Sequence, residues 1–164
     1  AYEQPALGMV YKLVAREVDG ELAPVIKVSS SKAKTTTPHI KEVYRIIDPV
    51  TDKFKGDYVT LMDEDPSTLE AVDLIDVRDP SFRNRIEQFK VERLLEPIFK
   101  DGELVYTVPT IEESRHFHET QIGRLWEEYK RLRLPEIYAV TFSDRLWKLK
   151  LDMIRDTRLA SGLK

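Results

Sequence analysis

The sequence predicts an α+β fold in which antiparallel hairpins form a small sheet and are followed by two C-terminal amphipathic helices. Two observations support this prediction. Strand-like runs separated by turn dipeptides fill the first two thirds of the 164-residue chain. In the last third, apolar residues recur mostly at three- and four-residue spacing, which is typical of amphipathic helices. The length fits one domain of about 150 residues.

Three hairpins are predicted from turn signals between the strand-like runs. Asp19-Gly20 and Asp101-Gly102 are tight-turn signals because glycine tolerates positive φ. Residues 63–82 are acidic and interrupted by two prolines, which predicts mostly loop. The predicted strand pairs are 10–18 with 22–29, 43–47 with 57–62 across a longer connection from Asp48 to Gly56, and 89–99 with 103–108.

Two helices are predicted in the last third. The segment Thr110–Glu113 is a capping box, in which the threonine hydroxyl accepts from the glutamate amide and the carboxylate reaches back. The amphipathic helix that follows is expected to end before Pro135, and Ser143 is expected to cap a second helix. Trp126 and Trp147 lie on the apolar stripes of these helices, so both are predicted to be core anchors.

Composition excludes several classes of protein. The net charge of −3 gives no global attraction to nucleic acid or to an anionic membrane surface. The chain has no cysteine, so disulfides and thiolate metal sites are excluded. It has no apolar run of about 18 residues and no signal-peptide pattern, which favours a cytoplasmic location. Because the chain begins with Ala1 and its first residues look like the interior of a protein, we expect a piece of a longer polypeptide.

The sequence contains no complete catalytic motif. It has no dinucleotide or phosphate-binding glycine loop, no zinc-protease motif and no nucleophile elbow. His116 and His118 are two residues apart in a predicted helix, so they are expected to point to different faces. The run Asp63–Asp65 lacks the spacing of a calcium loop and is interpreted as a solvated acidic loop. The residues alone therefore predict a soluble α+β domain without a complete active site.

One polar loop has a chemical interpretation. Residues 29–41, SSSKAKTTTPHIK, contain nine serine, threonine or lysine residues among thirteen. Hydroxyls, ammonium groups and free amides are the groups that bind phosphate, but the same composition is typical of a plain polar connector. Composition leaves both interpretations open.

Several stretches of the chain share the pattern of one enzyme family: Ala1–Gly8 with Val10–Val14; Ile26–Ser29, Lys34, Thr36, Pro38, Lys41 and Val43–Arg45; Arg93–Tyr106; Leu125-Trp126; and Ser143 with Leu146–Leu149. These stretches resemble nicotinate phosphoribosyltransferases over nearly the whole chain. Met9 and His39 depart from that pattern, because they stand where the family commonly has glycine. If the family's glycine serves a positive φ, His39 is the position where the loop geometry is in question.

The resemblance implies an enzyme of NAD biosynthesis. Such an enzyme joins nicotinate to 5-phosphoribosyl 1-diphosphate, giving nicotinate mononucleotide and pyrophosphate, with coupled ATP hydrolysis and Mg²⁺. The family fold is an irregular α/β barrel with flanking regions, assembled as a homodimer. This chain resembles the C-terminal part that follows the glycine-rich phosphate loop of the barrel. The catalytic residues are therefore expected to lie outside it, and we expect the chain alone to be inactive.

The resemblance also divides the chain and places its candidate site. Residues 1–30 are expected to be a strand hairpin that continues from the missing barrel, 31–109 a β-rich C-terminal domain, and 110–164 a helical segment. Lys27, Ser29, Lys34 and Thr36 are the candidate contacts with substrate phosphate or ATP, and packing of this segment against the barrel is the open alternative. The alternative is a free-standing, non-catalytic β-rich binding module that docks a partner through the basic 29–41 loop.

Overall fold

The computed structural model describes residues 10–31, 34–75 and 83–162. They form two compact units, called here the terminal unit (Ala1–Ile40 with Leu146–Lys164) and the central unit (Lys41–Arg145). Small sheets and helices occur together, so the chain is α+β as expected. The expected division of this chain into three parts at residues 30 and 109 stays a prediction.

The terminal unit contains the first predicted hairpin. Strands β1 (Ala15–Val18) and β2 (Glu21–Pro24) pair antiparallel, and both are shorter than the predicted runs. Asp19 and Gly20 have φ of 53° and 82°, so both central residues of the turn are left-handed, as a type I′ turn requires. Helix α3 (Asp144–Ala160) begins directly after Ser143, where a second helix is predicted.

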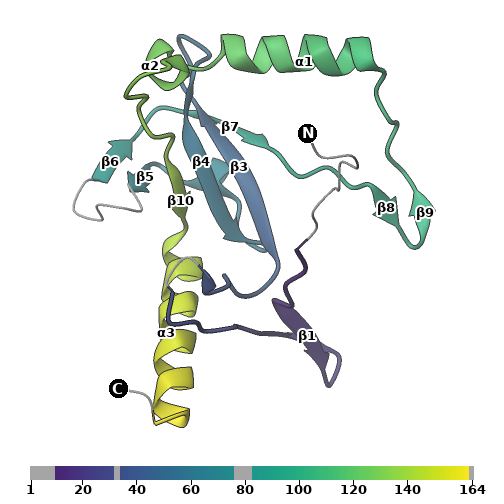
Figure 1. The fold of residues 1–164 in the computed structure, drawn as a ribbon, viewed down its shortest axis with the longest axis vertical. Coiled ribbons are helices and arrows are strands. Elements are labelled where there is room, and N and C mark those ends of the chain that lie inside the picture. Colours follow the sequence, from purple (N-terminus) through teal and green to yellow (C-terminus); the bar gives the residue numbers. More distant parts are fainter. Residues whose placement is uncertain (1–9, 32–33, 76–82, 163–164) are drawn as a thin grey trace, which may run out of the picture. The chain divides into compact units, whose positions relative to one another are not determined.

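The central unit is built on a four-stranded sheet in the order β10-β4-β3-β7 (Figure 1). The antiparallel pair β3 and β4 confirms the second predicted hairpin. The edge strand β10 runs parallel to β4, so the sheet is mixed and the prediction of antiparallel pairing alone is wrong. The strands are β3 (Lys41–Ile47), β4 (Phe54–Leu61), β7 (Lys90–Arg93) and β10 (Val140–Phe142).

The turn between β3 and β4 is shorter than predicted. The Asp48 carboxylate accepts from the amides of Val50 and Thr51 at 3.0 and 2.8 Å, which closes the turn early. Gly56 therefore lies inside β4 and not in the turn. A Cβ at this position would lie 2.9 Å from Leu74 and 3.0 Å from the Ala139 carbonyl oxygen, so the close packing requires glycine.

The predicted loop over residues 63–82 contains regular structure up to Ile75, and its part from 76 to 82 lies outside the described residues. A 3-10 turn at Pro66–Thr68 leads to strand β5 (Val72–Ile75), which pairs antiparallel with β6 (Arg83–Ile86). In the sequence, apolar Val72 and Leu74 alternate with polar Asp73, which is a strand signal. In the structure the two apolar residues are buried and Asp73 is half-buried. Ile46, Tyr58, Val72, Leu74 and Ile86 form one buried hydrophobic cluster in this unit.

The single helix predicted to end before Pro135 is two helices. Helix α1 (Ile111–Gly123) begins with the predicted capping box at Thr110 and ends at Gly123, and α2 (Glu127–Lys130) follows. The break has a tertiary cause: the carbonyl oxygen of Arg124 accepts from the Phe54 amide at 3.0 Å, and the guanidinium of Arg124 lies 4.6 Å from the Phe54 ring centre.

The two tryptophans are not core anchors. Trp126 lies between α1 and α2 and is 37% exposed, with its Nε1 donating to the Phe54 carbonyl oxygen at 2.9 Å. Trp147 lies on α3 and is 42% exposed. The fully buried residue of α3 is Leu146.

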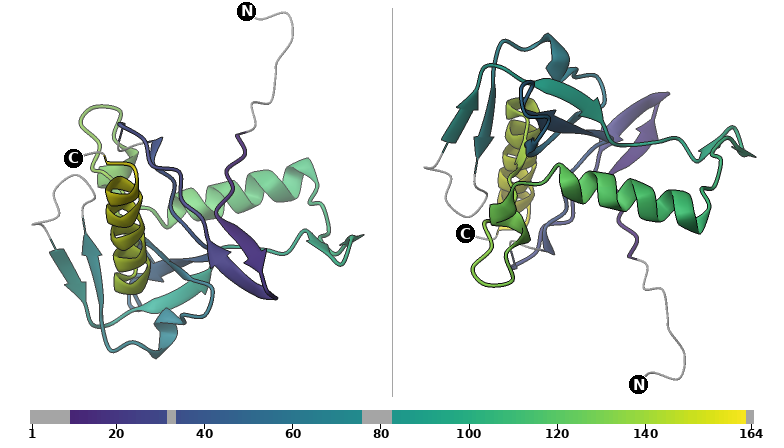
Figure 2. Two further views of the ribbon diagram at one scale, coloured as in Figure 1. Left: turned by 90° about the horizontal axis from the view of Figure 1, so that it is seen from below. Right: turned by 90° about the horizontal axis from the view of Figure 1, so that it is seen from above.

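The third predicted hairpin exists only in part. β7 pairs with β3, whereas the turn Asp101-Gly102 closes a separate short hairpin of β8 (Phe99–Lys100) and β9 (Glu103–Leu104). Asp101 and Gly102 have φ of 52° and 85°, the same turn geometry as at Asp19-Gly20. Figure 2 shows this hairpin and α1 set apart from the four-stranded sheet.

Candidate functional site

The predicted phosphate loop is closed by its own backbone. Lys27 and Thr36 pair across it: the Thr36 amide donates to the Lys27 carbonyl at 3.1 Å, and the Lys27 amide donates to the Thr36 Oγ1 at 2.8 Å. Thr36 is buried, with 9% of its surface exposed. Its hydroxyl therefore holds the base of the loop together.

The hydroxyls further along the loop also accept hydrogen bonds from amides within the loop. The Ser29 amide donates to the Thr35 Oγ1 at 3.2 Å, and the Ser31 amide donates to the Ser29 Oγ at 3.3 Å. The Lys34 amide donates to the Ser31 carbonyl at 3.0 Å. This use of serine and threonine side chains by nearby amides is typical of a structured turn.

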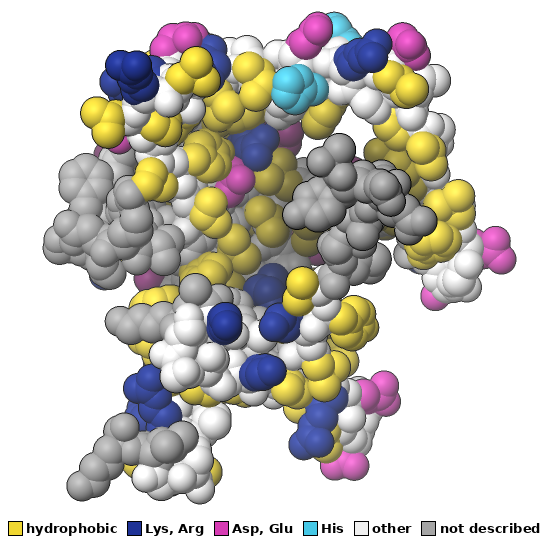
Figure 3. Space-filling model, viewed as in Figure 1, with side chains coloured by type: hydrophobic (Ala, Val, Ile, Leu, Met, Phe, Trp, Pro, Cys, Tyr) yellow, Lys and Arg dark blue, Asp and Glu magenta, His cyan; other side chains and the backbone are white. Residues whose placement is uncertain are grey.

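The two predicted lysine side chains lie on the surface and not inside the loop. Lys27 and Lys34 are both exposed, and neither forms an ion pair with a carboxylate in the described part of the chain. Figure 3 shows several Lys and Arg side chains on the surface of the terminal unit. Of the four predicted site residues, the structure thus presents two ammonium groups outward and uses Ser29 and Thr36 to shape the loop.

The loop ends at a left-handed residue. His39 has φ of 66°, the conformation that favours glycine, and its amide donates to the Val14 carbonyl at 2.7 Å. The Val25 amide donates to the same carbonyl at 2.8 Å, so Val14 connects both sides of the loop. The Nδ1 of His39 accepts from the Ile40 amide at 2.8 Å. A histidine thus occupies the backbone geometry for which the resemblance led us to expect glycine.

Lys150 was missed by sequence reasoning. Its Nζ donates to the Thr37 Oγ1 at 3.0 Å, and burial lowers the pKa of this lysine. It lies four residues from both Leu146 and Ile154 on α3, within the stripe that the helical period places inward. A lysine inside an apolar stripe is the sequence signal that could have identified it.

The acidic run at 63–65 has structural partners. The Glu64 carboxylate accepts from the Leu61 amide at 2.8 Å and from the Ser143 hydroxyl at 2.7 Å. Asp65 accepts from the Ser67 amide, and Asp63 pairs with Arg145 at 2.9 Å. The three carboxylates and Arg145 line a cavity of about 250 Å³ together with Tyr58, whose pKa burial raises to about 12.

The described residues contain no group of three or more His, Cys, Asp or Glu side chains that could hold a metal ion. None of the helices in the described part of the chain has the length and apolar character needed to cross a bilayer.

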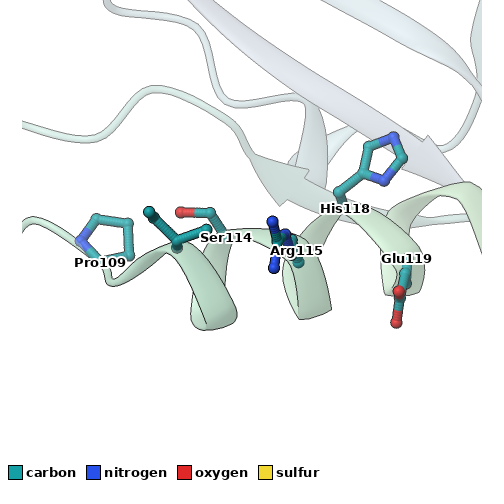
Figure 4. A pocket seen from close by; sticks show the side chains of 6 residues that line it. Pro109, Ser114, Arg115, His118 and Glu119 are labelled. Carbon is teal, nitrogen blue, oxygen red and sulfur yellow. The ribbon is translucent and has the colours of Figure 1, made fainter.

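The two histidines of α1 also lack a shared site. Figure 4 shows His118 and Glu119 extending in opposite directions from the helix. His118 lines an open hollow of about 340 Å³ together with five other residues, among them Arg115 and Ser114, and all six are exposed. His116 is not among them, as expected for two residues at this spacing. The hollow is a surface depression without a buried polar group.

The chain is similar to proteins of known family. The model of the nicotinate phosphoribosyltransferase C-terminal domain matches residues 40–150, which overlap the predicted 29–41 loop only in its last two residues. The nicotinate phosphoribosyltransferase of Bacillus subtilis is 39% identical over 158 residues, covering 96% of this chain and 32% of the relative. The human enzyme of the same name is 32% identical over 153 residues, covering 90% of this chain and 26% of the relative.

A solved structure agrees with these relatives. The crystal structure of human nicotinic acid phosphoribosyltransferase superimposes with a TM-score of 0.62 at 25% identity, covering 72% of this chain and 23% of that chain. The chain thus spans about a third or less of the length of the relatives that it matches.

Proposed function

Because the chain belongs to the nicotinate phosphoribosyltransferase family, as its C-terminal domain, we propose that it forms part of an enzyme that joins nicotinate to 5-phosphoribosyl 1-diphosphate. The products are nicotinate mononucleotide and pyrophosphate, with ATP hydrolysis coupled to the reaction. The observation that carries this proposal is the similarity to the Bacillus subtilis enzyme over 96% of the chain.

The rest of the enzyme supplies the reacting groups in this proposal. We assign Mg²⁺ and the catalytic residues to the remaining polypeptide and derive no step through the metal. The homodimeric assembly and the cytoplasmic location are part of the same proposal. This domain alone is expected to be inactive.

The contribution of this domain to substrate binding is assigned to the ammonium groups of Lys27 and Lys34. The hydrogen bonds of Thr36 and Ser29 hold the loop closed. Closure reduces the conformational freedom of the loop, which lowers the entropic cost of holding a charged group against an anion. The ligand is a phosphate group of 5-phosphoribosyl 1-diphosphate or of ATP, because an exposed ammonium binds phosphate by charge-assisted hydrogen bonds.

Replacing Lys34 by alanine in the full-length enzyme is expected to raise the apparent KM for 5-phosphoribosyl 1-diphosphate or ATP by about tenfold, the effect of losing one charge-assisted contact. The melting temperature should hardly change, because the side chain is exposed. Steady-state kinetics with each substrate varied in turn, together with thermal unfolding, measure both quantities. Unchanged KM values would remove Lys34 from the proposed site.

Two variants serve as matched controls. Lys148→Ala removes an exposed lysine of the same unit that pairs with Asp152 on α3, and its KM values should equal those of the wild type. Thr36→Val leaves the Lys27 amide without its side-chain acceptor and should lower stability by about 1–2 kcal/mol. A raised KM at unchanged stability would indicate a phosphate site, whereas lowered stability at unchanged KM would indicate a purely structural loop.

A further inference from the structure

A long segment of the central unit extends away from the sheet. Residues 95–122, called here the arm, comprise the β8–β9 hairpin, the chain that follows it and nearly all of α1 (Figures 1 and 2). None of the residues of α1 is buried within the described part of the chain. The arm therefore extends from the sheet and has no hydrophobic core of its own.

The arm carries many exposed apolar side chains. Figure 3 shows apolar side chains gathered over β8, β9 and the start of α1. Contiguous apolar surface of this kind marks an interaction site on a soluble protein. The exposed apolar residues of the arm are Leu95, Ile98, Phe99, Leu104, Val105, Val108, Ile111, Phe117 and Ile122, with exposures from 39% to 73%.

The elements of the arm require a partner for stability. Helix α1 has 13 residues, and an isolated helix shorter than about 12–15 residues is marginal in water even with a good cap. The β8–β9 hairpin has two residues per strand, and an isolated two-stranded hairpin is also marginal. A surface that covers the apolar side chains would stabilise both.

The C-terminal end of the arm is fixed to the sheet. The Arg45 Nη1 donates to the Gln121 Oε1 at 3.1 Å, and directly after the arm the Lys53 Nζ donates to the Gly123 carbonyl. Arg124 pairs with Glu92 of β7 at 3.1 Å. These contacts set the direction in which α1 leaves the sheet, so the arm presents its apolar residues from a defined base.

We propose that the arm is the surface on which this domain docks against the remaining polypeptide of the same enzyme subunit. This inference rests on the proposed function, because that function places the domain in a longer enzyme. The relatives contain two thirds or more of their length outside the region matched here. That polypeptide is covalently tethered to the domain, so its effective concentration at the arm exceeds that of any second copy.

The test is photo-crosslinking in the full-length enzyme. A p-benzoylphenylalanine at Phe117, and in a second variant at Phe99, places the crosslinker on each half of the arm. After irradiation, crosslinks should join the arm to peptides outside the 164 residues of this chain, and the product should keep the mass of one subunit on a denaturing gel. The same crosslinker at Val50, which is 88% exposed outside the arm, should give none of these crosslinks.

Hydrogen–deuterium exchange of the unmodified full-length enzyme gives a readout that needs no substitution. Amides of α1 should exchange at least about 100-fold more slowly than those of the exposed turn at 49–52. Crosslinks of doubled mass would assign the arm to a second copy and overturn the proposal. Crosslinks confined to residues 1–164, or α1 amides that exchange as fast as the turn, would also overturn it.

The proposed function and the docking of the arm are contradicted by different experimental results. A wild-type full-length enzyme that forms no nicotinate mononucleotide would overturn the function, while the crosslinks would still report the docking surface. An active enzyme whose arm gives only doubled-mass crosslinks would overturn the docking and leave the function intact.

Discussion

Replacing Arg45 by alanine should lower the free energy of unfolding of the central unit by about 3–5 kcal/mol. The guanidinium forms two hydrogen bonds with the Asp57 carboxylate, at 2.9 and 3.3 Å, and it lies 4.3 Å from the Phe54 ring centre. The side chains of Arg45 and Asp57 are only 19% and 14% exposed. Without Arg45, the carboxylate keeps the Tyr138 hydroxyl as a donor at 2.9 Å but loses its counter-charge.

The pKa values of this cluster agree with a coupled network. Burial lowers the pKa of Arg45, but the hydrogen bonds and charge of Asp57 outweigh that effect, so the net direction is upward. Burial first, and then the charge of Asp57, raise the pKa of Tyr138. Both groups therefore keep their ordinary protonation states at neutral pH.

Urea unfolding measures the change for Arg45→Ala. Trp126 bonds to Phe54 beside Arg45, so its fluorescence reports the central unit in a Trp147→Phe background. Arg145→Ala is the control, because its pair with Asp63 is 57% and 64% exposed and should contribute no more than about 1 kcal/mol. If Arg45→Ala cost no more than this control, the buried network would not stabilise the fold.

Replacing Ile46 by alanine should lower the same free energy by about 3–4 kcal/mol. Ile46 follows Arg45 on β3 and points to the opposite face of the sheet, where it is 0% exposed. It packs in the core with Val72 and Leu74 of β5. Truncation removes buried apolar surface and leaves a cavity, and both effects are destabilising.

The same unfolding experiment distinguishes core packing from general sensitivity of the strand. Ile46→Val should cost about 1 kcal/mol because it removes one methylene from the same place. Val50→Ala removes two methyl groups from a side chain that is 88% exposed, and it should change stability by less than about 0.5 kcal/mol. Equal losses for Ile46→Ala and Val50→Ala would contradict the assignment of this core.

Local signals predicted the tight turns well. Asp19-Gly20 and Asp101-Gly102 have the predicted turn geometry because positive φ at both central residues is a property of the dipeptide itself. The capping box at Thr110 is equally local, and both of its reciprocal bonds are present.

Elements that depend on distant partners were not predictable. Strand β10 has three residues and forms only because β4, about 80 residues earlier in the chain, offers its edge. The break after α1 occurs where Arg124 contacts Asp52, Glu92 and Phe54, and no local pattern predicts those contacts. Tertiary contacts override helical periodicity at this point.

The candidate site shows the same limit. The composition of the 29–41 loop indicates a capacity to bind anions but does not say which hydroxyls are already used. Thr36 accepts from the Lys27 amide and Ser29 accepts from the Ser31 amide, so both hydroxyls also shape the loop, and phosphate contacts at Lys27, Ser29, Lys34 and Thr36 stay a prediction. His39 retains the left-handed backbone without glycine, with φ of 66°.

Product formation by the full-length enzyme tests the central claim most directly. The enzyme that contains this domain is incubated with nicotinate, 5-phosphoribosyl 1-diphosphate, ATP and Mg²⁺, and nicotinate mononucleotide and pyrophosphate are quantified in parallel with the 164-residue chain alone. The expected result is equimolar formation of both products by the full-length enzyme and none by the chain alone. No mononucleotide from a folded full-length enzyme, or turnover by the chain alone, would contradict it.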